Sequence, residues 1–490
     1  MLRIVASLLA LSLSLPCANA QFAYVDSVSG DDSNDGLTSA TAWRTLTRAT
    51  TGPSSATTIV VAPGVHDAAL GEVFPIVVPS GVIVVGPQGA VEPAVIDAGG
   101  APIAIDFAGP DGGGFGEFVV EDAAVGVRSV DADVRLFDLL VRGCRRAVEI
   151  STRGQAVDAE VDDLTVLDCG EGLVAEGFVS LSLFDCLFDS IATNGVRFAF
   201  DPTGIVGDFA FRQLVAIRCR FDRCDGVGLD IAIGGTEAPD IELLQLQALR
   251  SDTGIRMRVP VPAAVSSRIS LGQSTVAANG IGLDVESVDA VGIEQSVVDA
   301  NGLDVRATAG SAVAAQSHVG DGSIPAPSSG SARLVDPTGG DLRPSFASPV
   351  IDRNLNPGPT GIDGNLDLVP LRDWGALELQ TLSEPQFVHL GGTARFEVFG
   401  PQFATAVGLV GDLGNFSVAT RYGDLRLVPS TVRRQSAFPI EPGPAPTVWE
   451  IPVPNDPSLL GLHGVQVWVP SSISPTDGAL TTSAWFLVLP

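Results

Sequence analysis

The chain has 490 residues and carries 57 acidic residues against 28 basic ones, which gives a formal net charge of −29. This acidic net charge argues against a nucleic-acid-binding protein, which needs a basic surface. Every basic residue is an arginine, which excludes mechanisms that need a lysine base, a Schiff base or a P-loop lysine. With 45% hydrophobic and 17% charged residues, the composition favours long buried β-surfaces, in two or more domains.

The first 20 residues are typical of a secretory signal peptide. Arg3 is followed by an apolar run over residues 4–15, and residues 18–20 supply the small-x-small pattern of a cleavage site. We therefore expect a secreted mature protein, either extracellular or in the cell envelope, with the periplasm included. No second long apolar stretch follows, so no transmembrane anchor is expected after cleavage.

Residues 30–36 read Gly-Asp-Asp-Ser-Asn-Asp-Gly and offer several oxygen ligands of the kind that calcium prefers. Asp31, Asp32, Asn34 and Asp35 are weak calcium candidates, and calcium is the only cofactor for which we find ligands. The stretch lacks the spacing and the distal glutamate of an EF-hand loop. The favoured interpretation is an Asx-rich turn that caps the first coil of the fold.

Several short motifs occur in order between residues 22 and 105: Tyr-Val at 24–25, the acidic turn at 30–36, Trp-Arg-Thr-Leu at 43–46 and Pro-Gly at 63–64. This order resembles the beginning of secreted bacterial right-handed parallel β-helix proteins of the pectate-lyase-like superfamily, in particular a domain of unknown function in that group. The tyrosine that follows the Pro-Gly in that group is replaced here by Val65-His66. The resemblance implies a fold and export, and it implies no particular reaction.

The middle of the chain repeats itself. Six segments share a polar turn, a glycine and an apolar-x-apolar pattern, and their glycines are Gly172, Gly195, Gly226, Gly254, Gly280 and Gly302. A unit this short cannot bury its own apolar face, whereas units stacked in parallel do. The leucine frame and the helix that a leucine-rich repeat needs in each unit are not evident. The pattern predicts a right-handed parallel β-helix over residues 21–382, with 21–105 as its start and cap and 330–380 as its C-terminal coil.

Two further expectations follow from aligning these repeats on their glycines. Asn194, Asp225, Asn279 and Asn301 precede glycines, at positions where we expect left-handed backbone in a tight turn. Four residues after successive glycines come Asp230, Arg258, Asp284 and Arg306, which alternate in sign. We interpret this alternation as a stabilising ion ladder between coils, with a ligand groove as the alternative.

Five cysteines follow the signal peptide: Cys144, Cys169, Cys186, Cys219 and Cys224. In an exported chain, an odd number leaves at least one free or intermolecular thiol. Cys144 and Cys169 occupy the same turn offset on successive coils, and the segments around Cys186 and Cys219 also align. Either pair could be a disulfide or part of a buried thiol ladder, and the pattern leaves both readings open.

From Ser383 the repeat stops. Six candidate strands separated by glycine and proline predict a small antiparallel β-sandwich over residues 383–490. The complete expected fold is therefore all-β, with a solenoid followed by a sandwich.

Two functions remain open. The preferred one is a secreted, non-catalytic surface or matrix protein that binds a polysaccharide or a cell-surface protein. The resemblance also implies an alternative, because enzymes of the superfamily cleave or epimerise acidic polysaccharides. Without lysine, such a calcium-assisted lyase or epimerase would need an arginine base, and the weak candidates are Arg218, Arg220, Arg256 and Arg258. We cannot place the clustered acidic calcium site that this chemistry needs beside them.

Overall fold

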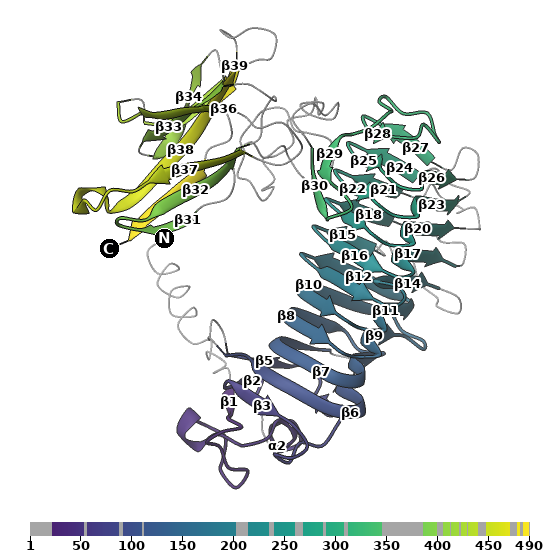
Figure 1. The fold of residues 1–490 in the computed structure, drawn as a ribbon. Helices are drawn as coiled ribbons and strands as arrows, with labels where there is room; N and C mark the ends of the chain where they lie inside the picture. Colours follow the sequence, from purple (N-terminus) through teal and green to yellow (C-terminus); the bar gives the residue numbers. More distant parts are fainter. Residues whose placement is uncertain are drawn as a thin grey trace, which may run out of the picture. The chain divides into compact units, whose positions relative to one another are not determined.

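A computed structural model of the chain is almost entirely β (Figure 1). It describes residues 22–489 except for 53–55, 88–91, 110–111, 202–213, 235–239, 260–267, 288–290, 308–311, 345–385, 399–404, 412, 421–422, 429, 440–446, 471–477 and 481–483. The described helical segments are α2 (Leu46–Thr51), η1 (Ser39–Thr41) and η2 (Pro457–Leu459). The predicted fold class, a parallel β-helix solenoid followed by small antiparallel sheets, is confirmed. The predicted signal peptide lies outside the described residues.

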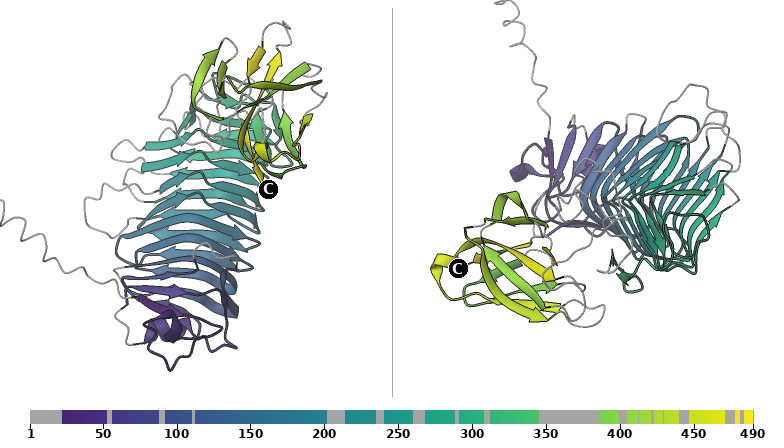
Figure 2. Two further views of the ribbon diagram at one scale, coloured as in Figure 1. Left: turned by 90° about the vertical axis from the view of Figure 1, so that its left-hand side faces the viewer. Right: turned by 90° about the horizontal axis from the view of Figure 1, so that it is seen from above.

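The chain forms two compact units, residues 1–215 with 222–237, and residues 216–221 with 238–490. In the first unit every coil adds strands to three parallel sheets, which we name the first, second and third faces (Figure 2).

The first face contains β1 (Phe22–Val25), β2 (Thr58–Val61), β5 (Val82–Val85), the beginnings of β7 (Gly113–Val130), β8 (Val134–Arg142) and β10 (Val157–Leu167), and β12 (Val179–Phe184). The second face contains β3 (Gly64–His66), the beginning of β6 (Ala94–Phe107), the middle of β7, the ends of β8 and β10, and β13 (Leu187–Ile191). The third face contains β4 (Ile76–Val78), the ends of β6 and β7, β9 (Arg146–Ser151), β11 (Glu171–Gly177), β14 (Val196–Phe200) and β17 (Val227–Ile233).

The second unit repeats the three-stranded coil. Its parallel ladders are β18 (Asp240–Leu244), β21 (Arg268–Gly272), β24 (Val291–Glu294) and β27 (Ala312–Ala315); β19 (Gln247–Leu249), β22 (Thr275–Ala277), β25 (Val297–Asp299) and β28 (His318–Val319); and β20 (Thr253–Val259), β23 (Ile281–Ser287) and β26 (Leu303–Ala307). The chain passes between the units within β15 (Leu214–Ile217) and β16 (Arg220–Cys224).

The register differs from the alignment on glycines at two places. Leu173 lies opposite Val196, as that alignment predicts. Val196, however, lies opposite Leu229 and not Val227, a shift of two residues. Ile281 is likewise opposite Thr253 and not Ile255. Because side chains alternate with a period of two, such a shift keeps the apolar residues inside, and the alternation alone cannot reveal it.

The left-handed residues are also not the predicted ones. Positive φ angles occur at Ala278 and Ala300, one residue before Asn279 and Asn301. The asparagines serve the interior instead, because Asn279 Nδ2 donates to the carbonyl of Ala248 at 2.9 Å and to Asn301 Oδ1 at 3.0 Å. These asparagines therefore stack their side-chain amides on neighbouring coils, and they do not adopt the left-handed backbone of a turn.

The described part of the predicted C-terminal coil is an antiparallel hairpin. It pairs β29 (Leu334–Asp336) with β30 (Asp341–Pro344), where the sequence predicted another parallel rung. Leu342 packs on Leu249 and Ala277, so the hairpin covers part of the solenoid of its own unit. Residues 345–380 of the predicted coil lie outside the described residues.

Small sheets with mainly antiparallel pairing follow. They consist of β31 (Gln386–His389), β32 (Thr393–Val398), β33 (Thr405–Gly411), β34 (Leu413–Thr420), β35 (Gly423–Leu427), β36 (Arg433–Pro439), β37 (Thr447–Pro452), β38 (Gly461–Pro470), β39 (Gly478–Leu480) and β40 (Ala484–Leu489). Phe396 and Trp449 of the β32–β37 pair share one hydrophobic core with Val467 of β38 and Phe486 of β40. No helix in the described part of the chain is long and apolar enough to cross a membrane.

Candidate functional site

An open groove of about 720 Å³ crosses the first face of the first unit. Its lining residues come from β5, β7, β8, β10, β12 and the turns that precede them: Gly81, Ile83, Gly113, Gly114, Asp133, Val134, Arg135, Asp158, Ala159, Glu160, Ser180, Ser182 and Phe184. The parallel register places one residue of each strand in a single column, in the order Ile83, Gly114, Arg135, Glu160 and Ser182. The groove is therefore built from regular rungs and not from long loops.

Glycines in β7 form the low floor of this groove. Residues 112–116 read Gly-Gly-Gly-Phe-Gly. A Cβ atom at Gly114 would lie 3.2 Å from the side chain of Ile83. Gly116, two residues further along β7, is not a lining residue; a Cβ atom there would lie 2.3 Å from the ring of Phe137 and 2.4 Å from the backbone oxygen of that residue. Sequence reasoning that used glycine only as a turn marker missed this site, and glycine inside a strand was the available signal.

The later rungs carry polar groups. Asp133 Oδ1 accepts a hydrogen bond from the backbone N–H of Asp158 at 2.8 Å. Arg135 Nη2 lies 3.6 Å from Glu160 Oε1, and these two side chains are 61% and 51% exposed. Together with Ser180, Ser182 and Phe184, the lining offers three carboxylates, one guanidinium, two hydroxyls and an aromatic ring.

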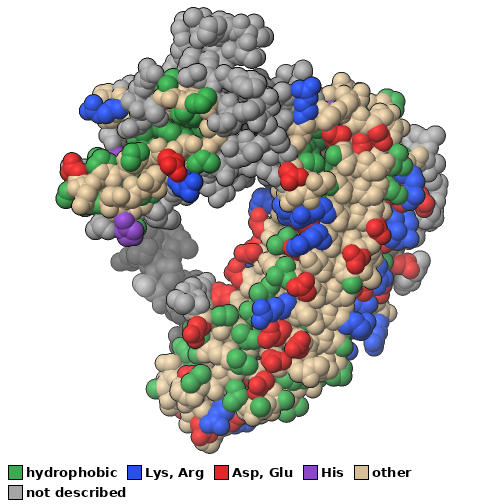
Figure 3. Space-filling model, in the orientation of Figure 1, with side chains coloured by type: hydrophobic (Ala, Val, Ile, Leu, Met, Phe, Trp, Pro, Cys, Tyr) green, Lys and Arg blue, Asp and Glu red, His purple; other side chains and the backbone are tan. Residues whose placement is uncertain are grey.

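The third face of the same unit has a different charge pattern. Arg128 binds Asp106 through two hydrogen bonds of 2.9 and 2.7 Å. Glu171 accepts hydrogen bonds from both Arg146 and Arg197 across neighbouring rungs. These carboxylates raise the pKa of Arg128, Arg146 and Arg197 against the opposing effect of burial. Figure 3 shows acidic side chains and arginines interspersed over the side of the molecule turned to the viewer.

One pair of the predicted ion ladder is present. Asp284 binds Arg306, whose Nε lies 2.8 Å from Asp284 Oδ1. The predicted pairing of Arg258 with Asp284 is wrong, because the residue opposite Asp284 on that side is Arg256, and Arg258 lies opposite Glu286. The Asp284–Arg306 pair supports a structural role for these two charges.

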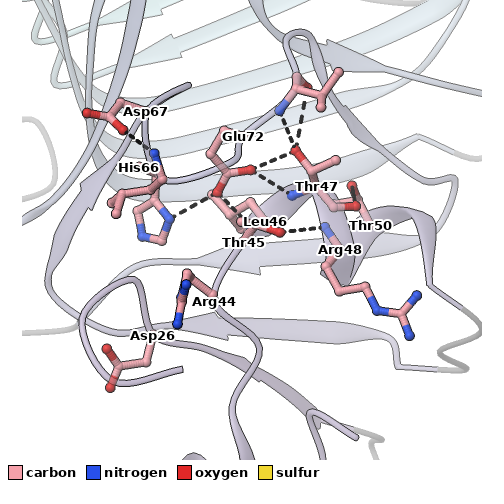
Figure 4. A network of polar contacts seen from close by, with 12 residues as sticks. Asp26, Arg44, Thr45, Leu46, Thr47, Arg48, Thr50, His66, Asp67 and Glu72 are labelled. Carbon is pink, nitrogen blue, oxygen red and sulfur yellow. Dashed lines mark hydrogen bonds and ion pairs between the residues drawn. The ribbon is translucent and has the colours of Figure 1, made fainter. Parts of the chain in front are cut away.

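A buried polar network holds the N-terminal cap together (Figure 4). Glu72 accepts hydrogen bonds from the backbone N–H groups of Leu46 and Thr47 at the start of α2, at 2.7 and 2.8 Å. His66 Nδ1 lies 3.2 Å from Glu72 Oε1, and the side chains of His66 and Glu72 are 0% and 1% exposed. Because both are closed to solvent, we assign them to the structure of the cap.

The four calcium candidates lie on the loop between β1 and α2. Asp32 accepts from the N–H and the hydroxyl of Thr45, Asp31 from the N–H of Ser33, and Asp35 from the hydroxyl of Thr41. Asn34 Nδ2 donates to the carbonyl of Ala42. These bonds lower the pKa of Asp31 and Asp35. Among the described residues, no three His, Cys, Asp or Glu side chains gather as metal ligands. Calcium binding at this loop stays a prediction.

The arginine candidates do not form one cluster. Arg220 lies on β16, where Nη1 donates to Gln247 Oε1 at 3.1 Å and Nη2 to the carbonyl of Gly340 at 3.4 Å. Arg256 and Arg258 lie on β20, in a different ladder of the coil. Arg218 stands at a left-handed corner just before β16. The role of an arginine as a base stays a prediction.

All five described cysteines are buried free thiols. Cys144 and Cys169 do occupy equivalent corners, because the N–H of Gly170 donates to the carbonyl of Cys144 at 2.9 Å. Cys186 and Cys219 belong to different compact units.

Comparison with known families gives one match. Residues 28–101 match the family described as a protein of unknown function, DUF1565. This confirms the predicted domain of unknown function at the N-terminus. The matched stretch contains the His66–Glu72 network and ends before the glycine floor of the groove. No curated protein matches the chain.

Proposed function

We propose that this chain is a secreted, non-catalytic surface or matrix protein, and that the groove of the first face binds an extended glycan. The observation that carries the proposal is the groove itself, which combines hydrogen-bonding groups with the half-buried ring of Phe184 over several regular rungs. Sugar hydroxyls need such acceptors and donors, and a sugar ring packs on an aromatic face. Membership of the pectate-lyase-like superfamily is part of this proposal.

The charges of the lining favour a neutral glycan over a polyuronate. Asp133, Asp158 and Glu160 bring three negative charges, and Arg135 offsets one of them. A polymer of uronic acids would add like charges to this surface, whose chain already has a net charge of −29. Neutral sugars meet no such repulsion.

The placement of the carboxylates supports binding without hydrolysis. Asp158 and Glu160 are two residues apart on β10 and therefore point to the same side of one strand. Glycoside hydrolysis instead needs two carboxyl groups on opposite sides of the scissile bond. The arginine candidates for lyase chemistry line none of this groove.

Isothermal titration of the purified full-length chain tests the proposal. The probes are cellohexaose and mannohexaose as neutral oligosaccharides, with hexagalacturonate as the acidic one. We expect binding of a neutral hexasaccharide and none of hexagalacturonate. Phe184→Ala and Glu160→Gln should each weaken that binding about fivefold or more, the effect of losing a stacked ring or a charged hydrogen bond.

The matched control is Glu294→Gln, an exposed glutamate on β24 that does not line the groove. It should bind like the parent. Equal affinities of Glu160→Gln, Glu294→Gln and the parent would overturn the assignment of the groove. Release of unsaturated uronate from pectate or alginate, abolished by Arg220→Ala or Arg256→Ala, would favour the enzymatic alternative instead.

A further inference from the structure

The corner between the second and third faces of the first unit carries a column of buried side chains. Backbone hydrogen bonds and strand register set its order as Ala123, Cys144, Cys169, Ile191 and Cys224, one residue per coil. All five are at most 5% exposed. Cys144 and Cys169 are therefore direct neighbours, whereas Ile191 separates Cys169 from Cys224.

The remaining cysteine of this unit, Cys186, faces no cysteine within the described residues of the same unit. Cys186 directly precedes Leu187, which lies opposite Thr165, so the residue facing Cys186 on the previous coil is Leu164. Within the described residues of the first unit, the strand register therefore places one pair of cysteines opposite each other, Cys144 and Cys169. Residues directly opposite on adjacent rungs are about 4.8 Å apart, within the range of Cα separations found in disulfides.

The two thiols influence each other's protonation. The neighbouring Cys169 thiol lowers the pKa of Cys144, while the Cys144 thiol and burial raise the pKa of Cys169. Each thiol also points the same way along its coil, since Cys144 Sγ lies 3.6 Å from the carbonyl of Arg142 and Cys169 Sγ lies 3.4 Å from that of Leu167.

We propose that Cys144 and Cys169 form a disulfide that links two successive coils when the chain folds in the presence of a disulfide oxidant. With oxidised glutathione, the Cys144 thiolate attacks one sulfur of the oxidant and releases a glutathione thiolate. The Cys169 sulfur then gives up its proton and attacks Cys144 Sγ, which releases the second glutathione. The two cysteines lose two electrons and two protons, and two reduced glutathione molecules carry both.

Burial determines when the reaction occurs. Both side chains are 2% exposed in the folded chain, so the oxidant reaches them before this corner closes. Once formed, the bond is shielded from external thiols. This property is independent of the glycan groove and is expected whether or not a sugar binds.

Refolding tests the link directly. The full chain is denatured, reduced, refolded in a glutathione redox buffer, alkylated with N-ethylmaleimide and digested without reduction by trypsin and Asp-N. These enzymes separate Cys144, in residues 143–145, from Cys169, in residues 168–184, and leave Cys186 in another peptide. We expect the first two peptides as one cross-linked species that disappears on reduction.

Two variants make the result specific. Cys144→Ser should abolish the cross-linked species, while Cys224→Ser, two coils away from Cys169, should retain it. A second refolding of the parent, with diamide in place of the glutathione buffer and the same digest, provides an independent measurement. Recovery of both peptides in alkylated form from the parent in both experiments, or a link from Cys144 to a different cysteine, would overturn the proposal.

Discussion

The first and third faces of the N-terminal unit are built by the same rungs and are used differently. On the third face, Glu171 joins Arg146 and Arg197 across three strands, and charge on one rung is balanced on the next. On the first face, glycine replaces side chains at Gly114 and Gly116, and carboxylates outnumber the single arginine. The first face thus combines a hollow with unbalanced charge, which supports the proposal that a ligand binds there.

The largest effect is expected at the glycine of the first face with the least room for a side chain, Gly116, which packs against Phe137. Gly116→Ala places a Cβ 2.3 Å from the Phe137 ring and 2.4 Å from the Phe137 backbone oxygen. Forcing the two rungs apart should lower the free energy of unfolding by about 1–3 kcal/mol. Thermal denaturation followed by circular dichroism measures the loss, and hydrogen exchange should locate it in residues 113–142.

Gly154→Ala is the matched control, because a Cβ there meets no atom within 4 Å and its φ is not positive. It should leave stability within about 0.5 kcal/mol of the parent. Equal thermal midpoints for the two variants would show that the neighbouring rungs adjust to a side chain at position 116 at no cost, and that a glycine is not required there.

The second effect separates the charge patterns of the two faces. Glu171→Gln removes the negative charge shared by Arg146 and Arg197, whose side chains are only 19% and 30% exposed. We expect a loss of about 1–2 kcal/mol, typical of hydrogen bonds to charged groups, with glycan binding unchanged. Glu160→Gln, the same substitution in the groove, removes an exposed pair and should change stability by less than about 0.5 kcal/mol.

Denaturation curves of these two variants, with sugar titrations beside them, check the contrast. If Glu160→Gln proved the more destabilising of the two, the carboxylates of the groove would be structural and the difference between the faces would disappear.

Much of this fold could be predicted from the sequence because its signals repeat. The glycine-anchored repeats indicate stacked coils. Val196, Phe198 and Leu229, which we predict to point inward, are fully buried, whereas Leu303 at the equivalent position of a later coil is 36% exposed. The exact register could not be predicted. A period of two is satisfied equally well by a shift of two residues, and the decision between Val227 and Leu229 rests on packing along the whole coil.

The candidate site was less predictable for a related reason. Its residues share no motif, since Ile83, Gly114, Arg135, Glu160 and Ser182 become one column only through the register. The sequence search looked for chemistry in local runs such as residues 30–36, whose side chains serve the loop that holds them. A groove assembled from one residue per rung needs the three-dimensional pairing to be seen.

The smallest expected effect concerns pH at the corner beside the groove. Burial, a hydrogen bond from protonated Asp163 to Asp138, and the charges of Asp138, Asp162 and Asp185 raise the pKa of Asp163. The folded chain thus holds this proton more tightly than the unfolded chain, so stability falls as pH rises from about 4 through the raised value. Asp163→Asn should remove that part of the fall, seen as a smaller drop in melting temperature between pH 4 and pH 7 than in the parent.

Asp31→Asn should act in the opposite sense. Hydrogen bonds from Ser33 lower the pKa of Asp31, so the stability that ionised Asp31 contributes is lost as pH falls. If the melting temperatures of Asp163→Asn and the parent changed with pH in the same way, the stacked carboxylates around Asp163 would not destabilise the fold. The contrast with the charge-balanced third face would then be lost.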